Sequence, residues 1–138
     1  MQIDKTELIN IALEYRKNSY SPYSKYKVGA AVLTSSGKIY GGANIENAAY
    51  PAGLCAERTA IFKAISEGET ELIAIAICGG SKEEADDFAY PCGMCRQVMR
   101  EFSEPSELVI LVAKSVEDYE EYTLEQLLPH SFGPENLK

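Results

Sequence analysis

Tryptophan is absent from this 138-residue chain, histidine occurs once, and no apolar run approaches the length that a membrane-spanning helix needs. Such a helix requires about 20 mostly apolar residues, so we expect no membrane partner. The segment from Met1 to Lys5 has neither the basic region nor the apolar stretch of a secretory signal. The sequence therefore predicts a cytoplasmic protein.

Positive charge is also scarce, since 13 lysine and arginine residues stand against 21 aspartate and glutamate residues, and the formal net charge is −8. Proteins that bind polymeric nucleic acid collect its phosphates with positive charge, so we expect no polynucleotide partner. The single histidine, His130, suits a surface position, which leaves any metal site dependent on thiolates. The length and a hydrophobic content of 46% are ordinary for one globular domain over residues 1–138.

Hydrophobic periodicity predicts helices that alternate with strands. Apolar residues at helical spacing favour helices near 6–17, 55–67 and 92–103, and a short helix capped by Thr123. Strands are expected at 28–33 and 38–43 as a hairpin, at 72–78 and 108–112 as buried apolar strands, and as a strand end near 122. The segment 81–87 predicts a solvated acidic loop. This order is typical of an α/β domain with a mixed sheet and helices on both faces.

Three of the four cysteines fall at predicted helix starts, Cys55 at one and Cys92 and Cys95 at another. A helix N-terminus favours thiolate over thiol, and two residues between cysteines is a common zinc-binding spacing. Taken alone, Cys92 and Cys95 would equally suit a redox pair or half of a structural zinc site. The fourth cysteine, Cys78, lies in a predicted apolar strand and is expected to be a buried small hydrophobic residue.

Three thiolates leave one position of a tetrahedral zinc ion open, which is the catalytic rather than the structural arrangement. Glu57 follows Cys55 by two residues and could reach a bound water without binding the metal. Three thiolates against one Zn²⁺ leave a local charge of about −1. Arg58 is placed to donate hydrogen bonds to the sulfurs and offset that charge.

With these residues the chain resembles the zinc-dependent cytidine deaminases, through Cys55-Ala56-Glu57 and Pro91-Cys92-Gly93-Met94-Cys95. The segments 23–31, 42–50, 95–97 and 127–132 are similar to the small homotetrameric branch that acts on free nucleosides, so the resemblance covers nearly the whole chain. It implies a three-layer α/β/α fold with a mixed five-stranded sheet and one zinc ion per subunit. It also implies a homotetramer whose active sites are shared between subunits.

The resemblance carries metal-site roles over to particular positions. Cys55, Cys92 and Cys95 match the zinc ligands, and Glu57 matches the glutamate that shuttles protons. Arg58 and Gln97 are expected to tune the charge at the zinc ion, although Gln97 could orient Arg58 or simply face solvent.

Seven further positions match residues that contact the nucleoside, namely Tyr26, Asn44, Glu46, Ala48, Tyr50, Ala56 and Phe132. Asn44 and Glu46 match the pair that binds the ribose 3′-hydroxyl, and the backbone near Ala56 matches groups that read the pyrimidine. Tyr26 and Phe132 match aromatic positions that flank the base, with Phe132 arriving from a neighbouring subunit. Ala48 and Tyr50 match sugar contacts across a subunit boundary.

Without the resemblance the same residues have simpler interpretations. Asn44 and Glu46 would be turn residues, and Tyr26 and Phe132 would be core or interface aromatics. The chain departs from the family pattern at Tyr26, where phenylalanine is expected, and in the strongly acidic stretch 82–87.

The predicted activity is hydrolytic deamination of cytidine and 2′-deoxycytidine to the uridine nucleosides with release of ammonia, as in pyrimidine salvage. Zinc-bound hydroxide would attack carbon 4 while Glu57 shuttles protons. One alternative is deamination of another small aminopyrimidine or of a nucleoside antibiotic, and another is a zinc-binding interaction module without turnover. A polynucleotide-editing deaminase is disfavoured by the net charge.

Overall fold

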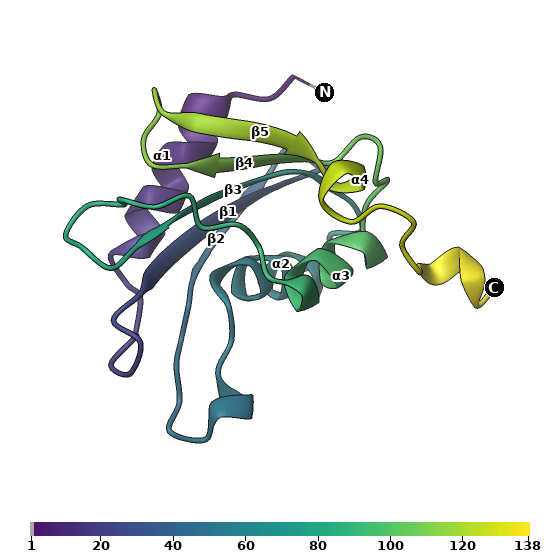
Figure 1. Ribbon diagram of the computed structural model, residues 1–138. Coiled ribbons are helices and arrows are strands. Elements are labelled where there is room, and N and C mark those ends of the chain that lie inside the picture. The colour runs from purple at the N-terminus through teal and green to yellow at the C-terminus, as the bar shows by residue number, and fades with distance from the viewer. Residues whose placement is uncertain (1) are drawn as a thin grey trace.

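A five-stranded mixed sheet lies at the centre of the computed structural model, which describes residues 2–138 (Figure 1). The strands are β1 (Lys27–Thr34), β2 (Ile39–Ala43), β3 (Leu72–Gly80), β4 (Val109–Ala113) and β5 (Tyr119–Thr123). Their order across the sheet is β2-β1-β3-β4-β5, with β3 and β4 parallel and every other neighbouring pair antiparallel. The expected five-stranded mixed sheet is confirmed.

Helices cover both faces of this sheet and complete the expected three layers (Figure 1). On one face, Leu8 and Ile9 of α1 (Lys5–Arg16) pack in a core that includes Ala31 of β1. On the other face, α2 (Ala56–Ser66), α3 (Gly93–Glu101) and α4 (Leu124–Leu127) share a core with Ala30 and Val32. The two cores take alternate residues of β1, as the pleat of a strand requires. No helix within residues 2–138 is long and apolar enough to cross a membrane.

Local capping residues mark the starts of α1 and α4 and the end of α2. The Asp4 carboxylate accepts a hydrogen bond from the Glu7 N–H at 3.0 Å, so it caps α1. Thr123 and Gln126 form a reciprocal pair of capping bonds at the start of α4. Gly68 follows α2 with φ of 103°, a left-handed conformation that suits glycine at a helix end. Each helix predicted near 6–17, 55–67 and 92–103 is confirmed to within two residues.

The loop between β3 and α3 is less free than a solvated acidic loop would be. Side chains over 81–84 are exposed, but the backbone is held by the buried guanidinium of Arg16 at the end of α1. This guanidinium donates four hydrogen bonds of 2.6 to 3.1 Å to the carbonyl oxygens of Lys27, Gly80, Lys82 and Glu83. A buried arginine requires acceptors for its donors, so this contact fixes the loop that leads to Cys92.

Candidate active site

The cysteines that the sequence singles out lie together at the starts of α2 and α3. Cys55 is the N-cap of α2, Cys92 is the N-cap of α3, and Cys95 lies in the first turn of α3. The Sγ atoms of Cys92 and Cys95 are 3.5 Å apart, those of Cys55 and Cys92 are 3.9 Å apart, and all three lie within 4.8 Å of one another. Three thiols at this separation can bind one tetrahedral metal ion together.

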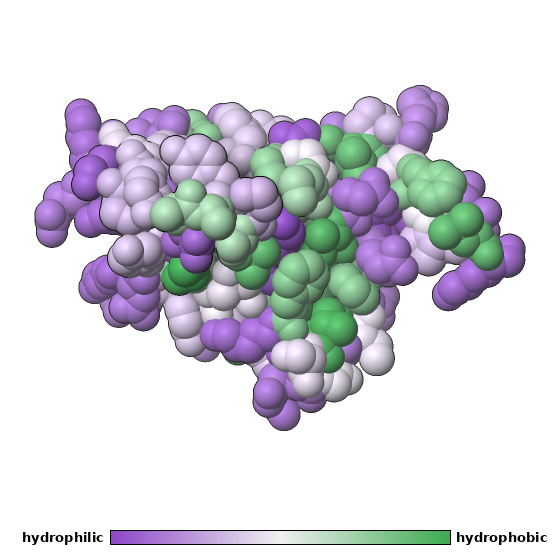
Figure 2. Space-filling view, turned by 90° about the horizontal axis from the view of Figure 1, so that it is seen from below, coloured by the Kyte–Doolittle hydropathy of each residue, from purple (hydrophilic) through white to green (hydrophobic). Residues whose placement is uncertain are grey.

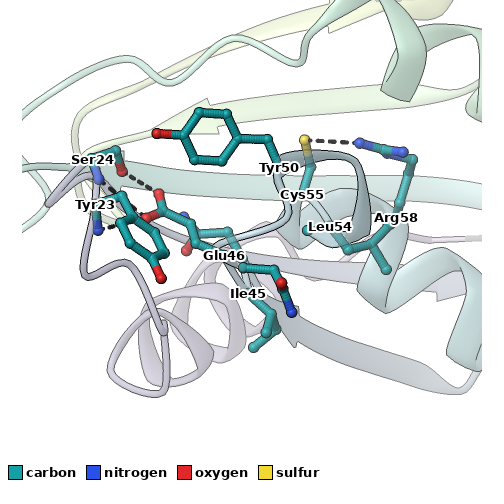
Figure 3. A pocket seen from close by; sticks show the side chains of 11 residues that line it. Tyr23, Ser24, Ile45, Glu46, Tyr50, Leu54, Cys55 and Arg58 are labelled. Carbon is teal, nitrogen blue, oxygen red and sulfur yellow. Dashed lines mark hydrogen bonds between the residues drawn. The ribbon is translucent and has the colours of Figure 1, made fainter.

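The surroundings of the cluster favour thiolate at Cys55 and disfavour it at Cys95. Interaction with the Cys95 thiol and a hydrogen bond from Arg58 lower the pKa of Cys55 to about 5, against the opposing effect of burial. The Arg58 Nη2 donates to Cys55 Sγ at 3.3 Å, as the dashed line in Figure 3 shows. The same thiol interaction and burial raise the pKa of Cys95. Cys55 is therefore the thiol of the cluster that loses its proton most readily.

Glu57 occupies the first turn of α2, directly after the Cys55-Ala56 pair, and only 5% of its surface is exposed. Burial raises the pKa of its carboxyl to about 7, and the nearby negative charge of Cys55 adds to the effect. A carboxyl that titrates near neutral pH can both accept and deliver a proton under physiological conditions. Glu57 therefore has the properties of a general acid and base beside the thiol cluster.

A cavity of about 510 Å³ opens beside Cys55 (Figure 3). It is lined by eleven residues, Tyr23, Ser24, Asn44, Ile45, Glu46, Asn47, Tyr50, Gly53, Leu54, Cys55 and Arg58. The rings of Tyr23 and Tyr50 meet edge to face at its rim, with centroids 6.2 Å apart. Its size is within the range of small-molecule sites, and it brings polar side chains and a thiolate to the same space.

Residues 2–112 match the family described as the cytidine and deoxycytidylate deaminase zinc-binding region. The chain belongs to this family. A cytidine deaminase of Halalkalibacterium halodurans is 42% identical over 135 residues, which cover 98% of both chains. One of Sporosarcina psychrophila is also 42% identical over 135 residues, or 98% of this chain and 96% of the relative.

Solved structures agree with the sequence relatives. The crystal structure of cytidine deaminase from Burkholderia pseudomallei has a TM-score of 0.81 and 41% identity, covering 91% of this chain and 97% of that one. The cytidine deaminase of Mycobacterium tuberculosis has a TM-score of 0.81 and 35% identity, covering 96% and 99%. The chain is therefore a hydrolytic deaminase of the zinc-dependent cytidine deaminase family, and its cysteine cluster fits one zinc ion per chain.

Asn44 and Glu46 line the deaminase cavity and also hold the loop that precedes β1. The Glu46 carboxylate accepts from the N–H groups of Tyr23 and Ser24 at 3.0 and 3.1 Å, and from the Ser24 hydroxyl. These bonds, the hydroxyl first, lower the pKa of Glu46. A carboxylate offers about four acceptor positions, so Glu46 can still accept a hydroxyl from a ligand.

The Asn44 carboxamide binds the backbone on both sides of the start of β1. Its Oδ1 accepts from the Val28 N–H at 3.0 Å, and its Nδ2 donates to the Tyr26 carbonyl at 2.8 Å. The interpretation of Asn44 and Glu46 as turn residues therefore describes part of what they do, and their place in the cavity adds the possibility of ligand contact.

Tyr26 is half-buried against the core that includes Cys55 and does not line the cavity. Its hydroxyl donates to the Asp87 carboxylate at 3.0 Å. Burial, followed by this hydrogen bond, raises the pKa of Tyr26 to about 12. The extra hydroxyl of this tyrosine therefore has a partner in the acidic loop.

Four other predicted site residues, Ala48, Ala56, Gln97 and Phe132, do not line the cavity of their own chain. Ala56 is fully buried behind Cys55, whereas Ala48 and Phe132 are exposed and do not line the cavity. Gln97 donates from Nε2 to the Phe132 carbonyl at 2.9 Å. The Gln97 side chain is exposed, as one of its two expected placements has it, and this hydrogen bond ties it to the C-terminal segment.

Sequence reasoning did not assign a role to six residues that line the cavity, namely Tyr23, Ser24, Ile45, Asn47, Gly53 and Leu54. Two signals could have found them. Tyr23 and Ser24 belong to a segment that resembles the family, and the segment from Asn44 to Leu54 leads directly into the first cysteine of the cluster.

Proposed function

We propose that this deaminase converts cytidine and 2′-deoxycytidine to uridine and 2′-deoxyuridine, consuming water and releasing ammonia, in pyrimidine salvage. The observation that carries the proposal is the buried Glu57 carboxyl, with a pKa of about 7, beside a cluster of three thiols, of which Cys55 lines the cavity. The curated relatives that support the substrate are named cytidine deaminases. A purely structural zinc site does not require such a carboxyl.

Cys55, Cys92 and Cys95 would hold the zinc ion, which when bound acts as a Lewis acid that makes water nucleophilic near neutral pH. Glu57 accepts the proton of the attacking water and delivers it to ring nitrogen 3, which makes carbon 4 electrophilic. It then takes the proton of the hydroxyl that has added to carbon 4 and delivers it to the amino group, which leaves as ammonia while nitrogen 3 keeps the first proton. Its burial makes this exchange feasible, because the neutral and ionised carboxyl have similar free energies near pH 7.

Glu46 and Asn44 are proposed to bind the sugar. Glu46 retains acceptor capacity and Asn44 lies beside it in the cavity, so the two suit a ribose 3′-hydroxyl. Cytidine and 2′-deoxycytidine both carry that hydroxyl and differ only at the 2′-position. Both nucleosides should therefore be substrates, whereas free cytosine should be a poor one.

Four chains are proposed to assemble so that each active site is completed by a neighbour. Tyr50 is 78% exposed at the rim of the cavity, and Phe132 is 59% exposed on the C-terminal segment. Figure 2 shows that apolar side chains gather on the face seen from below. Exposed aromatic residues of this kind favour a protein interface, and Phe132 and Ala48 would then contact substrate bound by another chain.

The direct test follows the loss of ultraviolet absorbance as the zinc-loaded protein meets cytidine, 2′-deoxycytidine or cytosine. Conversion of the two nucleosides at similar rates, with cytosine slower by orders of magnitude, is the expected result. Glu57→Ala, with its zinc content measured, is the control for the proton shuttle. Zinc-loaded protein that leaves both nucleosides unchanged would refute the proposal and direct attention to other aminated pyrimidines or to a module without turnover.

A further inference from the structure

Three side chains of α3 bind the C-terminal segment 127–135. Arg96 donates to the Leu127 carbonyl at 2.7 Å, and Gln97 donates to the Phe132 carbonyl at 2.9 Å. Arg100 donates from Nε to the Ser131 hydroxyl at 2.8 Å. Residues 129–132 belong to no helix or strand of the described chain, so their position depends on these contacts.

Arg100 is the most enclosed of these anchors, because only 9% of its surface is exposed and the segment 131–135 folds around its guanidinium. Its Nη2 pairs with the Glu135 carboxylate. A Cβ atom at Gly133 would clash with the Arg100 guanidinium where it now lies. The backbone of Gly133 is extended, with φ of −146°, so a side chain there would displace the guanidinium rather than strain the backbone.

The same helix carries two of the metal ligands. Cys92 is the N-cap of α3 and Cys95 lies in its first turn, and Arg96 and Arg100 lie four residues apart on one side of the turns that follow. A helix of nine residues is about 13 Å long and behaves as one rigid element. The C-terminal segment is therefore fixed relative to the metal cluster by a single helix.

We propose that Arg100 is a positioning residue, which holds the segment 127–135 on α3 so that Phe132 is presented at a fixed place for the active site of a neighbouring chain. The inference rests on the proposed function, in which Phe132 flanks the base from another subunit. Gln97 supports the same contact through the Phe132 carbonyl. Arg100 acts through Phe132 and does not touch the substrate.

The test compares Arg100→Ala with wild type in steady-state kinetics with cytidine. KM should rise about three- to tenfold, which is the contribution of an ordinary aromatic contact, while kcat stays within about twofold and zinc content is unchanged. Arg100→Lys should give an intermediate KM, because an ammonium group lacks the planar fork that reaches Ser131 and Glu135 together. Lys82→Ala removes an exposed positive charge elsewhere and should leave KM unaltered.

Two further variants separate positioning from a general loss of structure. Gly133→Ala displaces the guanidinium without changing α3, so it should raise KM as Arg100→Ala does and remains informative if that variant does not fold. In a Phe132→Ala background, Arg100→Ala should add no further rise in KM. An unchanged KM in both Arg100→Ala and Gly133→Ala, or full additivity with Phe132→Ala, would overturn the proposal.

Hydrogen exchange separates failure of this inference from failure of the proposed function. Amides of residues 128–134 should exchange faster in Arg100→Ala than in wild type, with exchange over 95–99 of α3 unchanged. If wild-type protein does not deaminate cytidine, the proposed function fails and the exchange result alone decides whether Arg100 holds the segment. Identical exchange in the two proteins would show that it does not.

Discussion

Replacement of Glu57 by glutamine should separate stability from catalysis in this deaminase. The Glu57 carboxyl is buried and forms no ion pair within residues 2–138. Burial raises its pKa from an ordinary value of 4.5 to about 7. Glutamine keeps the size and shape of the side chain but has no charge to bury, so the variant should gain stability relative to wild type wherever the carboxyl of the unfolded chain is ionised.

The size of the effect follows from the pH dependence of protonation. Below pH 4.5 the carboxyl is protonated in both folded and unfolded chains, so its burial does not lower the free energy of unfolding of wild type through ionisation. As pH rises toward 7 the unfolded chain releases the proton before the folded chain does, and wild type loses stability. At 1.36 kcal/mol per pH unit, the interval from 4.5 to about 7 amounts to about 3 kcal/mol. Glu57→Gln should lack this loss.

Urea unfolding of the metal-free proteins between pH 4.5 and pH 8 measures the difference directly. The free energy of unfolding of Glu57→Gln minus that of wild type should grow by about 3 kcal/mol over this range, while deamination falls by at least about 10²-fold because both proton transfers are lost. Glu84→Gln, which removes an exposed carboxylate, should show no such growth. A difference that stays constant with pH would refute the assignment of a neutral buried carboxyl.

Four other substitutions test neighbouring parts of the site. Cys92→Ala should abolish stoichiometric zinc binding and lower the melting temperature, because metal binding and folding are coupled; metal analysis of the purified variant checks this. Arg58→Ala should weaken zinc binding about 10- to 100-fold in chelator competition, since outer hydrogen bonds to metal ligands commonly contribute that much. Tyr26→Phe should lower the free energy of unfolding by about 1 kcal/mol, and Asp87→Ala should add nothing to it if the hydrogen bond between them is the cause.

Patterns that depend on neighbouring residues were sufficient to predict most of the fold. The helical spacing in α1, with Asp4 before it, and the continuous apolar run of β3 each gave bounds close to those observed. The thiol cluster could also be predicted from the sequence, because Cys92 and Cys95 are three residues apart and Cys55 immediately precedes another helix. Local periodicity and capping chemistry contain this information.

Contacts between distant segments could not be predicted in the same way. Nothing near Arg16 in the sequence indicates that its guanidinium binds carbonyl oxygens at residues 80–83. Gln97 likewise looked equally suited to Arg58 or solvent, and its contact with Phe132 depends on how the chain returns after β5. Each of these bonds joins groups more than 30 residues apart, so only the assembled sheet brings the partners together.

The pKa of Glu57 depends on the charges of the thiol cluster and of Arg58. Three thiolates and one zinc ion carry about −1 in total, and the hydrogen bond from Arg58 and the N-termini of α2 and α3 offset that charge. Negative charge left at Cys55 adds to the effect of burial on Glu57, so a weaker offset would raise the pKa of that carboxyl further. An acid too weak to ionise near pH 7 could not accept the proton of water. The positive charge of Arg58 itself lowers the pKa of Glu57, so under the proposed mechanism Arg58→Ala should impair proton transfer as well as metal binding.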